Sequence, residues 1–564
     1  MHMFLLLACI ETGVQDRVAD PDPGNIAPQE PAVDEECPET QAVDPSVAPT
    51  ECQRPPRLHT PPTLSWEVPT FVHKPAAKMV MMAPVAAESR VWFISFEGRS
   101  WYKGGVLRAL DGATGEVLVS VANTDLEGSS GLALGDLDGD GSLEVVGVST
   151  TGQAIAFDWS GTELWRSQAF ASDVGYSANP TLADLDGDGT LEVLVGRAVV
   201  SHTGETLGIG TLGKGTPGSY GATPVAADLD GDGILEVLVG NGAFDAQGQT
   251  LWSLEEPDGF VGVGDVDGDG ADEVVVSGGG KLRVQSAEGV RWSVALPGAE
   301  STQGGPPTLA DLDGDGAHEI AVSAGAALSV FNGSGELLWE AATEDSSTGI
   351  TALCAFDLSG DGHPELVLAD EVAVRAFGPT GQALWTYENH GNWTTVEYAT
   401  FADIDGDGHA ELMVARSENP NDPERSYTGL AVLGSDNWPQ GPLAWPQHAL
   451  SSGDGSFRAW PGLSSPGVDL QLGFEAVCEL ECTERVIGEV ILVNYGTMSA
   501  QAGSVTLWDG DRILKQWTHP GLDPGAGVAF AFEVDAGVQP TVTRSADALD
   551  CAEPEGVVSP AWCL

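Results

Sequence analysis

An acidic stretch of nine residues occurs seven times in the middle of the chain. Its first copy reads Asp136-Leu-Asp138-Gly-Asp140-Gly-Ser142-Leu-Glu144, and an apolar run follows it. The copies begin at Asp136, Asp184, Asp228, Asp265, Asp311, Asp357 and Asp403, so 267 residues over six intervals give a mean period of 44.5 residues. A period of about 20–50 residues is typical of stacked supersecondary units. The repeat therefore determines the fold.

Each copy has the composition of a calcium-binding loop. Acids stand at positions 1, 3, 5 and 9, and a glycine at position 6 permits a tight turn. Ca²⁺ prefers about six to eight hard oxygen ligands. We assign side-chain oxygens to positions 1, 3, 5 and 9 and the main-chain carbonyl to position 7. A simple acidic turn would not need four acids at fixed spacing, and without a cation these carboxylates would repel one another.

The predicted metal ligands are the residues at these five positions in the seven copies. In chain order they are Asp136, Asp138, Asp140, Ser142, Glu144, Asp184, Asp186, Asp188, Thr190, Glu192, Asp228, Asp230, Asp232, Ile234, Glu236, Asp265, Asp267, Asp269, Ala271, Glu273, Asp311, Asp313, Asp315, Ala317, Glu319, Asp357, Ser359, Asp361, His363, Glu365, Asp403, Asp405, Asp407, His409 and Glu411. Ser359 replaces an aspartate in the sixth copy, which leaves that ion one charge fewer. We expect about seven Ca²⁺ ions, with the Asp357 site the weakest.

An EF-hand loop begins in the same way, but it ends with a glutamate at position 12 and lies between helices. Position 12 here is glycine, valine or leucine, within segments that have the pattern of β-strands. Over about residues 78–450 the repeat resembles instead the FG-GAP/VCBS repeat of integrin-type β-propellers. Four short strands per repeat are also the pattern of a propeller blade.

In the second unit the four strands are expected at 132–135, 143–147, 154–157 and 163–165. Tryptophans recur in the fourth strand, which favours packing between blades over a platform for a ligand: Trp165, Trp252, Trp292, Trp339 and Trp385. Residues 78–120 predict a further blade without a metal loop, with strands at 79–85 and 91–96. Eight blades follow. Seven is the alternative, because residues 64–68 suit a fourth strand that closes the ring from the N-terminal side.

The predicted fold class is all-β, with the propeller followed by an Ig-like β-sandwich. The segments Val493-Asn494-Tyr-Gly496-Thr and Leu522-Asp-Pro-Gly525 resemble the CARDB type of bacterial adhesion module. Strands are expected there at 469–474, 489–494, 503–508 and 528–534. The predicted regions are a signal peptide (1–9), an acidic, proline-rich tether (10–62), the propeller (63–460) and the Ig-like domain (467–564).

The N-terminus indicates export. Leu6-Leu7-Ala8-Cys9 resembles a bacterial lipobox, which implies a lipid on Cys9, although no Lys or Arg precedes the apolar run. A plain secretion signal or a misplaced start is the alternative. Six other cysteines group by proximity into pairs that suit disulfides in an oxidising compartment, with a zinc site as the alternative for the middle pair: Cys37 and Cys52, Cys478 and Cys482, Cys551 and Cys563.

The charge excludes some classes of partner. The chain has 84 acidic and 23 basic residues and a formal net charge of −61. Nucleic acids and anionic lipid headgroups need the opposite sign. Beyond the N-terminus, no stretch reaches the ~18 apolar residues of a membrane span. We expect a lipoprotein of the bacterial cell envelope, in the outer membrane and facing outward, or a secreted protein.

The resemblance implies that partners bind to the face opposite the calcium loops. The aromatic and histidine residues expected there are Trp101, Tyr102, Tyr176, Tyr220, His390, Trp393 and Tyr427, with Arg99, Lys103 and Arg425 as charged neighbours. The first hypothesis is a surface binding or adhesion scaffold for a protein or carbohydrate, without enzymatic activity. The alternatives are a polysaccharide-active enzyme, with His390 beside Glu388 as acid or base, a quinone-dependent dehydrogenase and a purely structural surface protein. G-x-S-x-G, H-E-x-x-H and P-loop motifs do not occur.

Overall fold

The computed structural model describes most of residues 61–448 and six strands beyond them. The described segments are 61–98, 104–218, 220–298, 303–345, 348–359, 363–393, 397–407, 409–418, 427–435, 438, 444–448, 470–477, 485–494, 503–509, 512–519, 527–535 and 541–544. The predicted lipid-attachment and disulfide cysteines lie outside these segments, as do the predicted signal peptide and nearly all of the tether.

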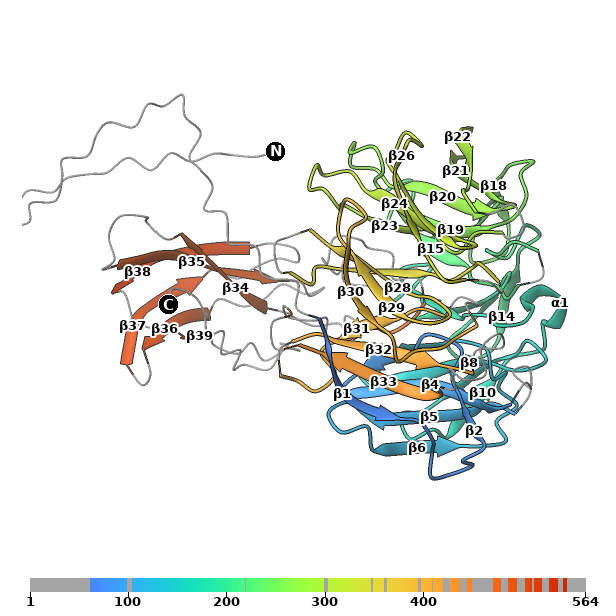
Figure 1. Cartoon of the computed structure of the whole chain (residues 1–564), viewed down its shortest axis with the longest axis horizontal. Coiled ribbons are helices and arrows are strands. Elements are labelled where there is room, and N and C mark those ends of the chain that lie inside the picture. Colours follow the sequence, from blue (N-terminus) through green and yellow to red (C-terminus); the bar gives the residue numbers. More distant parts are fainter. Residues whose placement is uncertain are drawn as a thin grey trace, which may run out of the picture. The chain divides into compact units, whose positions relative to one another are not determined.

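Eight antiparallel sheets form the blades of a propeller (Figure 1). In each blade the strands are named A to D from the inside, because the A strands of consecutive blades contact each other. Blade 1 contains β2 (Ala77–Met79), β3 (Val85–Ala87), β4 (Arg90–Glu97), β5 (Val106–Asp111) and β6 (Val117–Val121). Blade 2 contains β7 (Leu132–Gly135), β8 (Glu144–Val148), β9 (Ala154–Phe157) and β10 (Glu163–Arg166).

The next five blades follow in chain order, each with four strands. Blades 3 and 4 contain β11 (Thr181–Ala183), β12 (Glu192–Val195), β13 (Ala198–Val200), β14 (Thr206–Ile209), β15 (Val225–Ala227), β16 (Glu236–Val239), β17 (Gly242–Phe244) and β18 (Thr250–Ser253). Blades 5 to 7 contain β19 (Phe260–Gly264), β20 (Glu273–Gly278), β21 (Lys281–Ser286), β22 (Gly289–Ala295), β23 (Thr308–Ala310), β24 (Glu319–Ala324), β25 (Ala327–Phe331), β26 (Leu337–Ala342), β27 (Leu353–Phe356), β28 (Glu365–Ala369), β29 (Val374–Phe377) and β30 (Ala383–Tyr387). A one-turn helix, α1 (Ala171–Val174), precedes β11.

Blade 8 is assembled from both ends of the propeller. Its A to C strands are β31 (Thr400–Ala402), β32 (Glu411–Arg416) and β33 (Gly429–Gly434), and its D strand is β1 (Thr63–Val68). β1 pairs with β33 antiparallel, from Thr63 opposite Gly434 to Val68 opposite Leu430 (Figure 1). The N-terminal strand therefore closes the ring, as the seven-blade alternative required, but the ring has eight blades.

Blade 1 differs from the prediction of a single strand at 79–85. Both β2 and β3 pair with β4, and the chain leaves the sheet between them, where the Val80 amide donates to the Arg416 carbonyl of blade 8 at 3.2 Å. The turn after β3 consists of Glu88 and Ser89, with φ of 49° and 56°. Two consecutive positive φ values define the two-residue hairpin turn that suits strand twist. This short turn takes the place of a metal loop.

The strand D tryptophans pack between blades, as predicted. In four blades the indole ring lies on a glycine in the C–D turn of the next blade, where a Cβ atom would be within 2.7–2.9 Å of the ring: Trp66 on Gly115, Trp165 on Gly204, Trp292 on Gly335 and Trp339 on Gly381. Three of these rings also donate their indole N–H to a carbonyl of that turn at 2.7–2.8 Å. Trp385 is buried and stacks instead on Trp438.

Replacing one of these glycines is expected to loosen a blade seam. Gly335→Ala would place a methyl group 2.9 Å from the Trp292 ring at a residue with φ of +82°. We expect the free energy of unfolding to fall by about 2–4 kcal/mol, because overpacking adds to the cost of a left-handed conformation. Gly279→Ala is the control, since Gly279 has φ of +63° but no atom within 4 Å of the added Cβ. It should cost only about 1–2 kcal/mol in urea unfolding. Equal losses would contradict the seam contact.

The segment Trp445–His448 lies against the inner strands of blades 1 to 3. Trp445 forms a bridge with Ala86 of blade 1, and the Pro446 carbonyl accepts from the Leu134 amide of blade 2 at 2.8 Å. The Gln447 side chain accepts from an amide of blade 3 at 2.8 Å. A second cluster, formed by Met82, Phe260 and Ile350 with Tyr220, joins four segments far apart in the sequence. The described residues thus pack the interior of the ring.

His448 makes the propeller sensitive to acid. It is buried, its ring packs on Tyr398, and burial lowers its pKa from 6.5 to about 3. Below pH 6.5 His448 therefore binds a proton in the unfolded chain but not in the folded chain. The free energy of unfolding falls as the pH drops toward 3. We expect a loss of about 2 kcal/mol at pH 5 from this residue. His448→Phe should reduce the slope of stability against pH, measured by urea unfolding in saturating calcium.

Beyond the propeller, six strands form two antiparallel sheets of three strands. One has the order β34 (Leu470–Val477), β35 (Arg485–Asn494), β38 (Gly527–Asp535), and the other β37 (Arg512–His519), β36 (Gly503–Asp509), β39 (Thr541–Arg544). The four strands expected here are present, while β37 and β39 were not predicted. The Ig-like sandwich remains a prediction. In the part of the chain that is described, no helix is long and apolar enough to cross a membrane.

Candidate metal centres

Each acidic loop joins strand A to strand B of a blade. The aspartate at position 1 follows strand A, and the glutamate at position 9 is the first residue of strand B in all seven loops. Neighbouring loops contact each other: the Leu191 amide donates to the Leu137 carbonyl at 3.1 Å, and the His318 amide donates to the Asp265 carbonyl at 2.8 Å. The loops therefore lie side by side on one face of the ring, which we call the loop face.

Backbone hydrogen bonds hold the carboxylates in place. In the first loop Asp136 accepts from the amides of Asp140 and Gly141 at 3.1 and 2.8 Å. The carboxylate of Glu144 accepts from the Leu137 amide at 2.9 Å. This last bond, from position 2 to position 9, recurs in all seven loops at 2.7–3.2 Å. The donors fix the acids before any ion binds.

Two glycines make this geometry accessible. In the first loop φ is 73° at Gly139 and 89° at Gly141, in the left-handed region that glycine adopts without a steric cost. Sequence reasoning assigned a role only to the glycine at position 6. Position 4 is also glycine in every copy, so the repeat itself contained the signal.

The structure brings the predicted carboxylates together. Oxygens of Asp136, Asp138 and Glu144 lie within 4.8 Å of one another, and in the third loop the oxygens of Asp228, Asp230 and Asp232, at positions 1, 3 and 5, do the same. Burial first, and the nearby aspartates second, raise the pKa of Glu144 to about 7. Glu192 and Glu319 are shifted in the same way, and Glu411 rises to about 8. Such clusters can hold a metal ion, because a cation would relieve their mutual repulsion.

The donor atoms are hard oxygens, which fit Ca²⁺ and not a soft metal. Position 7 fits a main-chain ligand, because its side chains include Ile234, which is 43% exposed and has no oxygen to offer. In the sixth loop the Ser359 hydroxyl donates to Asp357 at 3.4 Å. Asp361 lies outside the described residues, so the predicted weakness of this loop remains a prediction.

The fourth loop contains a cation supplied by the protein. The Arg291 guanidinium contacts Asp267 at 2.7 Å and Glu273 at 2.8 Å, which are ligand positions 3 and 9. Sequence reasoning missed this residue. Arg291 stands directly before the strand D tryptophan, where other repeats have leucine: Leu164, Leu251, Leu338 and Leu384. Aligning the repeats on that tryptophan would have revealed the exception.

Removing Arg291 is expected to strengthen metal binding by the fourth loop. An ion must displace the guanidinium, and an exposed ion pair contributes about 0–1 kcal/mol. Arg291→Leu, which restores the residue of the other repeats, should therefore raise the calcium affinity of one site by up to about fivefold in a calorimetric titration. Arg166→Leu is the control, because Arg166 pairs with Asp125 and Glu163, outside any loop. An equal change in both variants would contradict this role.

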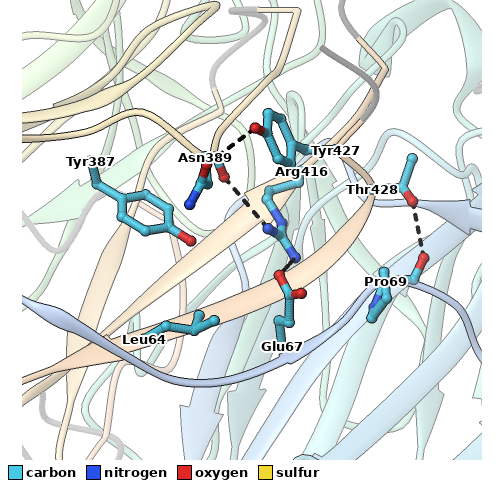
Figure 2. Close-up of a pocket in the computed structure, with 8 residues that line it drawn as sticks. All are labelled: Leu64, Glu67, Pro69, Tyr387, Asn389, Arg416, Tyr427 and Thr428. Carbon is cyan, nitrogen blue, oxygen red and sulfur yellow. Dashed lines mark hydrogen bonds and ion pairs between the residues drawn. The ribbon is translucent and has the colours of Figure 1, made fainter. Parts of the chain in front are cut away.

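The predicted ligand-face residues have different environments. Tyr176 is 63% exposed, and Tyr427 lines a pocket between blades 7 and 8 (Figure 2). Tyr220 is half-buried against the central cluster, and half-buried Trp393 packs on Met79, Met81 and Phe96. The remaining candidates of this set, with their charged neighbours, lie outside the described residues: Trp101, Tyr102, Arg99, Lys103 and Arg425.

His390 is fully buried, so its predicted place on a ligand face is wrong. Burial first, and the charges of Arg416 and Arg375 second, lower its pKa to about 3. The ring is therefore neutral and shielded from solvent. It cannot serve beside Glu388 as acid or base for a bound substrate. The sequence position alone did not reveal this burial, because distant segments cover the ring.

A model of the FG-GAP-like repeat matches residues 120–195, 265–322 and 357–414. These segments contain six of the seven acidic loops. The matched segments of the propeller are FG-GAP-like repeats. The match confirms the family that the spacing of the acids suggested, and the FG-GAP loops are the candidate metal centres described above.

Several solved structures are similar to this chain. The biofilm matrix protein Bap1 of V. cholerae is 19% identical, with a TM-score of 0.57, and the match covers 69% of this chain and 94% of Bap1. A rhamnogalacturonan lyase of Bacillus licheniformis is 16% identical, with a TM-score of 0.44, and the match covers 66% of this chain and 74% of the lyase. The likeness to Bap1 shows the fold alone. No curated protein matches the chain.

Proposed function

We propose that this protein is a calcium-stabilised scaffold at the bacterial cell surface, or outside the cell, that binds a protein or carbohydrate. The observation that carries the proposal is the division of the propeller into two faces. The acidic loops occupy the loop face, and antiparallel strands place the B–C and D–A connections at the other end of each blade. We call that end the ligand face. The loops of the ligand face do not have to coordinate a metal ion, and they include the exposed ring of Tyr176.

Calcium supports an extracellular location. Extracellular modules bind Ca²⁺ with dissociation constants of about 10⁻⁴–10⁻³ M. Seven loops that need such an ion are stabilised where calcium is abundant. Bap1, a biofilm matrix protein, has a similar fold. A propeller of this kind is therefore compatible with an extracellular role. Attachment through a lipid on Cys9 is part of this proposal.

Charge narrows the choice of partner. The formal net charge is −61, and seven Ca²⁺ ions would offset only a small part of it. A strongly anionic partner would be repelled at low salt. We therefore expect a neutral or basic ligand, and aromatic rings such as Tyr176 and Tyr427 suit stacking on sugars or on apolar side chains of a protein.

The test is binding of the full chain to arrays of glycans and matrix proteins in millimolar calcium. Tyr176→Ala and Tyr427→Ala, both on the ligand face, should weaken binding to at least one member of the array. Ile234→Ala is the control, because Ile234 is an exposed apolar residue of the loop face. Binding that is lost only with Ile234→Ala, or no binding to either array, would contradict the proposal.

A further inference from the structure

A pocket of about 320 Å³ lies in the seam between blades 7 and 8 (Figure 2). Its walls come from β1 and β30 with the residues that follow them, from the end of β32, and from the connection between β32 and β33. The lining residues are Leu64, Glu67, Pro69, Tyr387, Asn389, Arg416, Tyr427 and Thr428. Arg416 is the last residue of β32, and Glu411 of the seventh acidic loop is the first. The pocket is therefore on the ligand face, and its volume is typical of small-molecule sites.

Arg416 lies at the bottom of this pocket and is only partly satisfied. The residue is 1% exposed. Its guanidinium donates to the Glu67 carboxylate at 2.9 Å and, at 3.4 Å, to the Asn389 carbonyl, while its Nε–H has no partner. Burying a guanidinium is costly unless its N–H groups are hydrogen-bonded. The unpaired Nε–H of Arg416 therefore favours a ligand with a hydrogen-bond acceptor.

Two further polar groups face the same space. The Tyr387 hydroxyl is buried, and its hydrogen-bonding neighbour is the Asn389 side chain, which lowers the pKa that burial raises. The Asn389 side-chain oxygen accepts from the Tyr427 hydroxyl at 3.1 Å, which leaves the amide N–H groups as donors (Figure 2). Buried polar groups are nearly always paired in folded proteins. The unpaired Nε–H of Arg416, a residue that lines the pocket, points to a bound molecule.

The chemistry of the walls defines a ligand class. Arg416, Tyr387 and Asn389 offer donors, and Glu67 offers an acceptor. The rings of Tyr387 and Tyr427, with Leu64 and Pro69, supply apolar surface. A sugar ring combines these needs, because adjacent hydroxyls can accept from the guanidinium and donate to the carboxylate while a C–H face packs on an aromatic ring.

An acidic ligand fits less well. Glu67 already balances the charge of Arg416, so the pocket has no uncompensated positive charge. The net charge of the whole chain is also strongly negative. We propose that the pocket binds one neutral sugar ring through the Glu67–Arg416 pair, with Tyr387 and Asn389 as further hydrogen-bond donors. This inference rests on the proposed function and names its ligand class.

The experiment measures binding of methyl glycosides of glucose, galactose and mannose to the full chain in millimolar calcium, by saturation-transfer NMR and calorimetry. At least one should bind more tightly than glucuronate, the matched anion. Tyr387→Phe removes only the hydroxyl, so affinity should fall by about tenfold while the fold is kept. Thr386→Val is the control, since this hydroxyl is on the same strand and adjacent side chains point to opposite faces.

A second variant tests the acceptor. Glu67→Gln should lower the affinity at least tenfold, because a charged hydrogen bond contributes about 1.5–3 kcal/mol. Glu340→Gln, an exposed acid on β26, should have no effect, and melting curves will show that both variants are folded. Failure of all three glycosides to bind, tighter binding of glucuronate, or unchanged affinity in folded Tyr387→Phe would overturn the proposal.

The two proposals fail in different ways. An array ligand that binds equally to wild type and Tyr387→Phe, but not to Tyr176→Ala, would overturn the pocket and keep the binding scaffold. No binding to any glycan or protein would overturn both. Binding of a neutral glycan that is weakened by Tyr387→Phe and by Glu67→Gln would support both.

Discussion

A chain that lacks residues 1–68 is expected to lose about 5–10 kcal/mol of propeller stability, whereas a chain that lacks residues 1–62 is expected to keep it. The difference is β1, which pairs with β33 over the whole of its length. Without β1 the outer edge of blade 8 is unpaired, Trp66 no longer covers Gly115, and buried Arg416 loses Glu67. Each loss costs about one to several kcal/mol.

Urea unfolding followed by circular dichroism measures this effect. The shorter deletion is the matched control, because it removes the N-terminal region and leaves the ring closed. We expect a single cooperative transition in the control and a transition at lower urea concentration in the longer deletion. Equal midpoints would mean that β1 does not close the ring.

Removal of calcium is expected to cause the other large loss of propeller stability. An ion that binds only the folded state stabilises it by RT ln(1 + [L]/Kd). With dissociation constants of about 10⁻⁴–10⁻³ M and 10 mM calcium, each site contributes about 1.4–2.7 kcal/mol. Seven sites together contribute about 10–19 kcal/mol, so chelation should lower Tm strongly.

Magnesium separates specific binding from screening. Mg²⁺ has the same charge but demands a smaller octahedral site and gives up its waters reluctantly. After chelation, 10 mM magnesium should restore only a small part of the stability that 10 mM calcium restores. Equal recovery would indicate that general screening of an acidic surface is sufficient.

The sequence was sufficient to predict the features that depend on residues close together in the chain. The strands β7 and β9 have the bounds that were expected, and the acids of each loop converge because their spacing acts within nine residues. The closing strand was harder to place. Its partner in β33 lies about 370 residues away, as in the bond from Thr63 to Gly434, so no local pattern could decide between seven and eight blades.

The candidate sites divide in the same way. The loop acids were found, but Arg291 was missed because it reaches the loop from strand D of the same blade. His390 was placed on the surface, although packing of distant segments buries it completely. The pocket joins residues from Leu64 to Thr428. Such a site exists only after the ring has closed, so its residues carry no shared signal in the sequence.

The central claim is that the acidic loops bind calcium and thereby stabilise the propeller. The most direct measurement is the calcium content of the full chain after equilibrium dialysis against millimolar calcium, by atomic emission spectroscopy. The account predicts about seven ions per chain and loss of one ion when Asp136 and Asp138 are both replaced by Asn. A chain that retains no calcium, or the same number of ions in that variant, would contradict it.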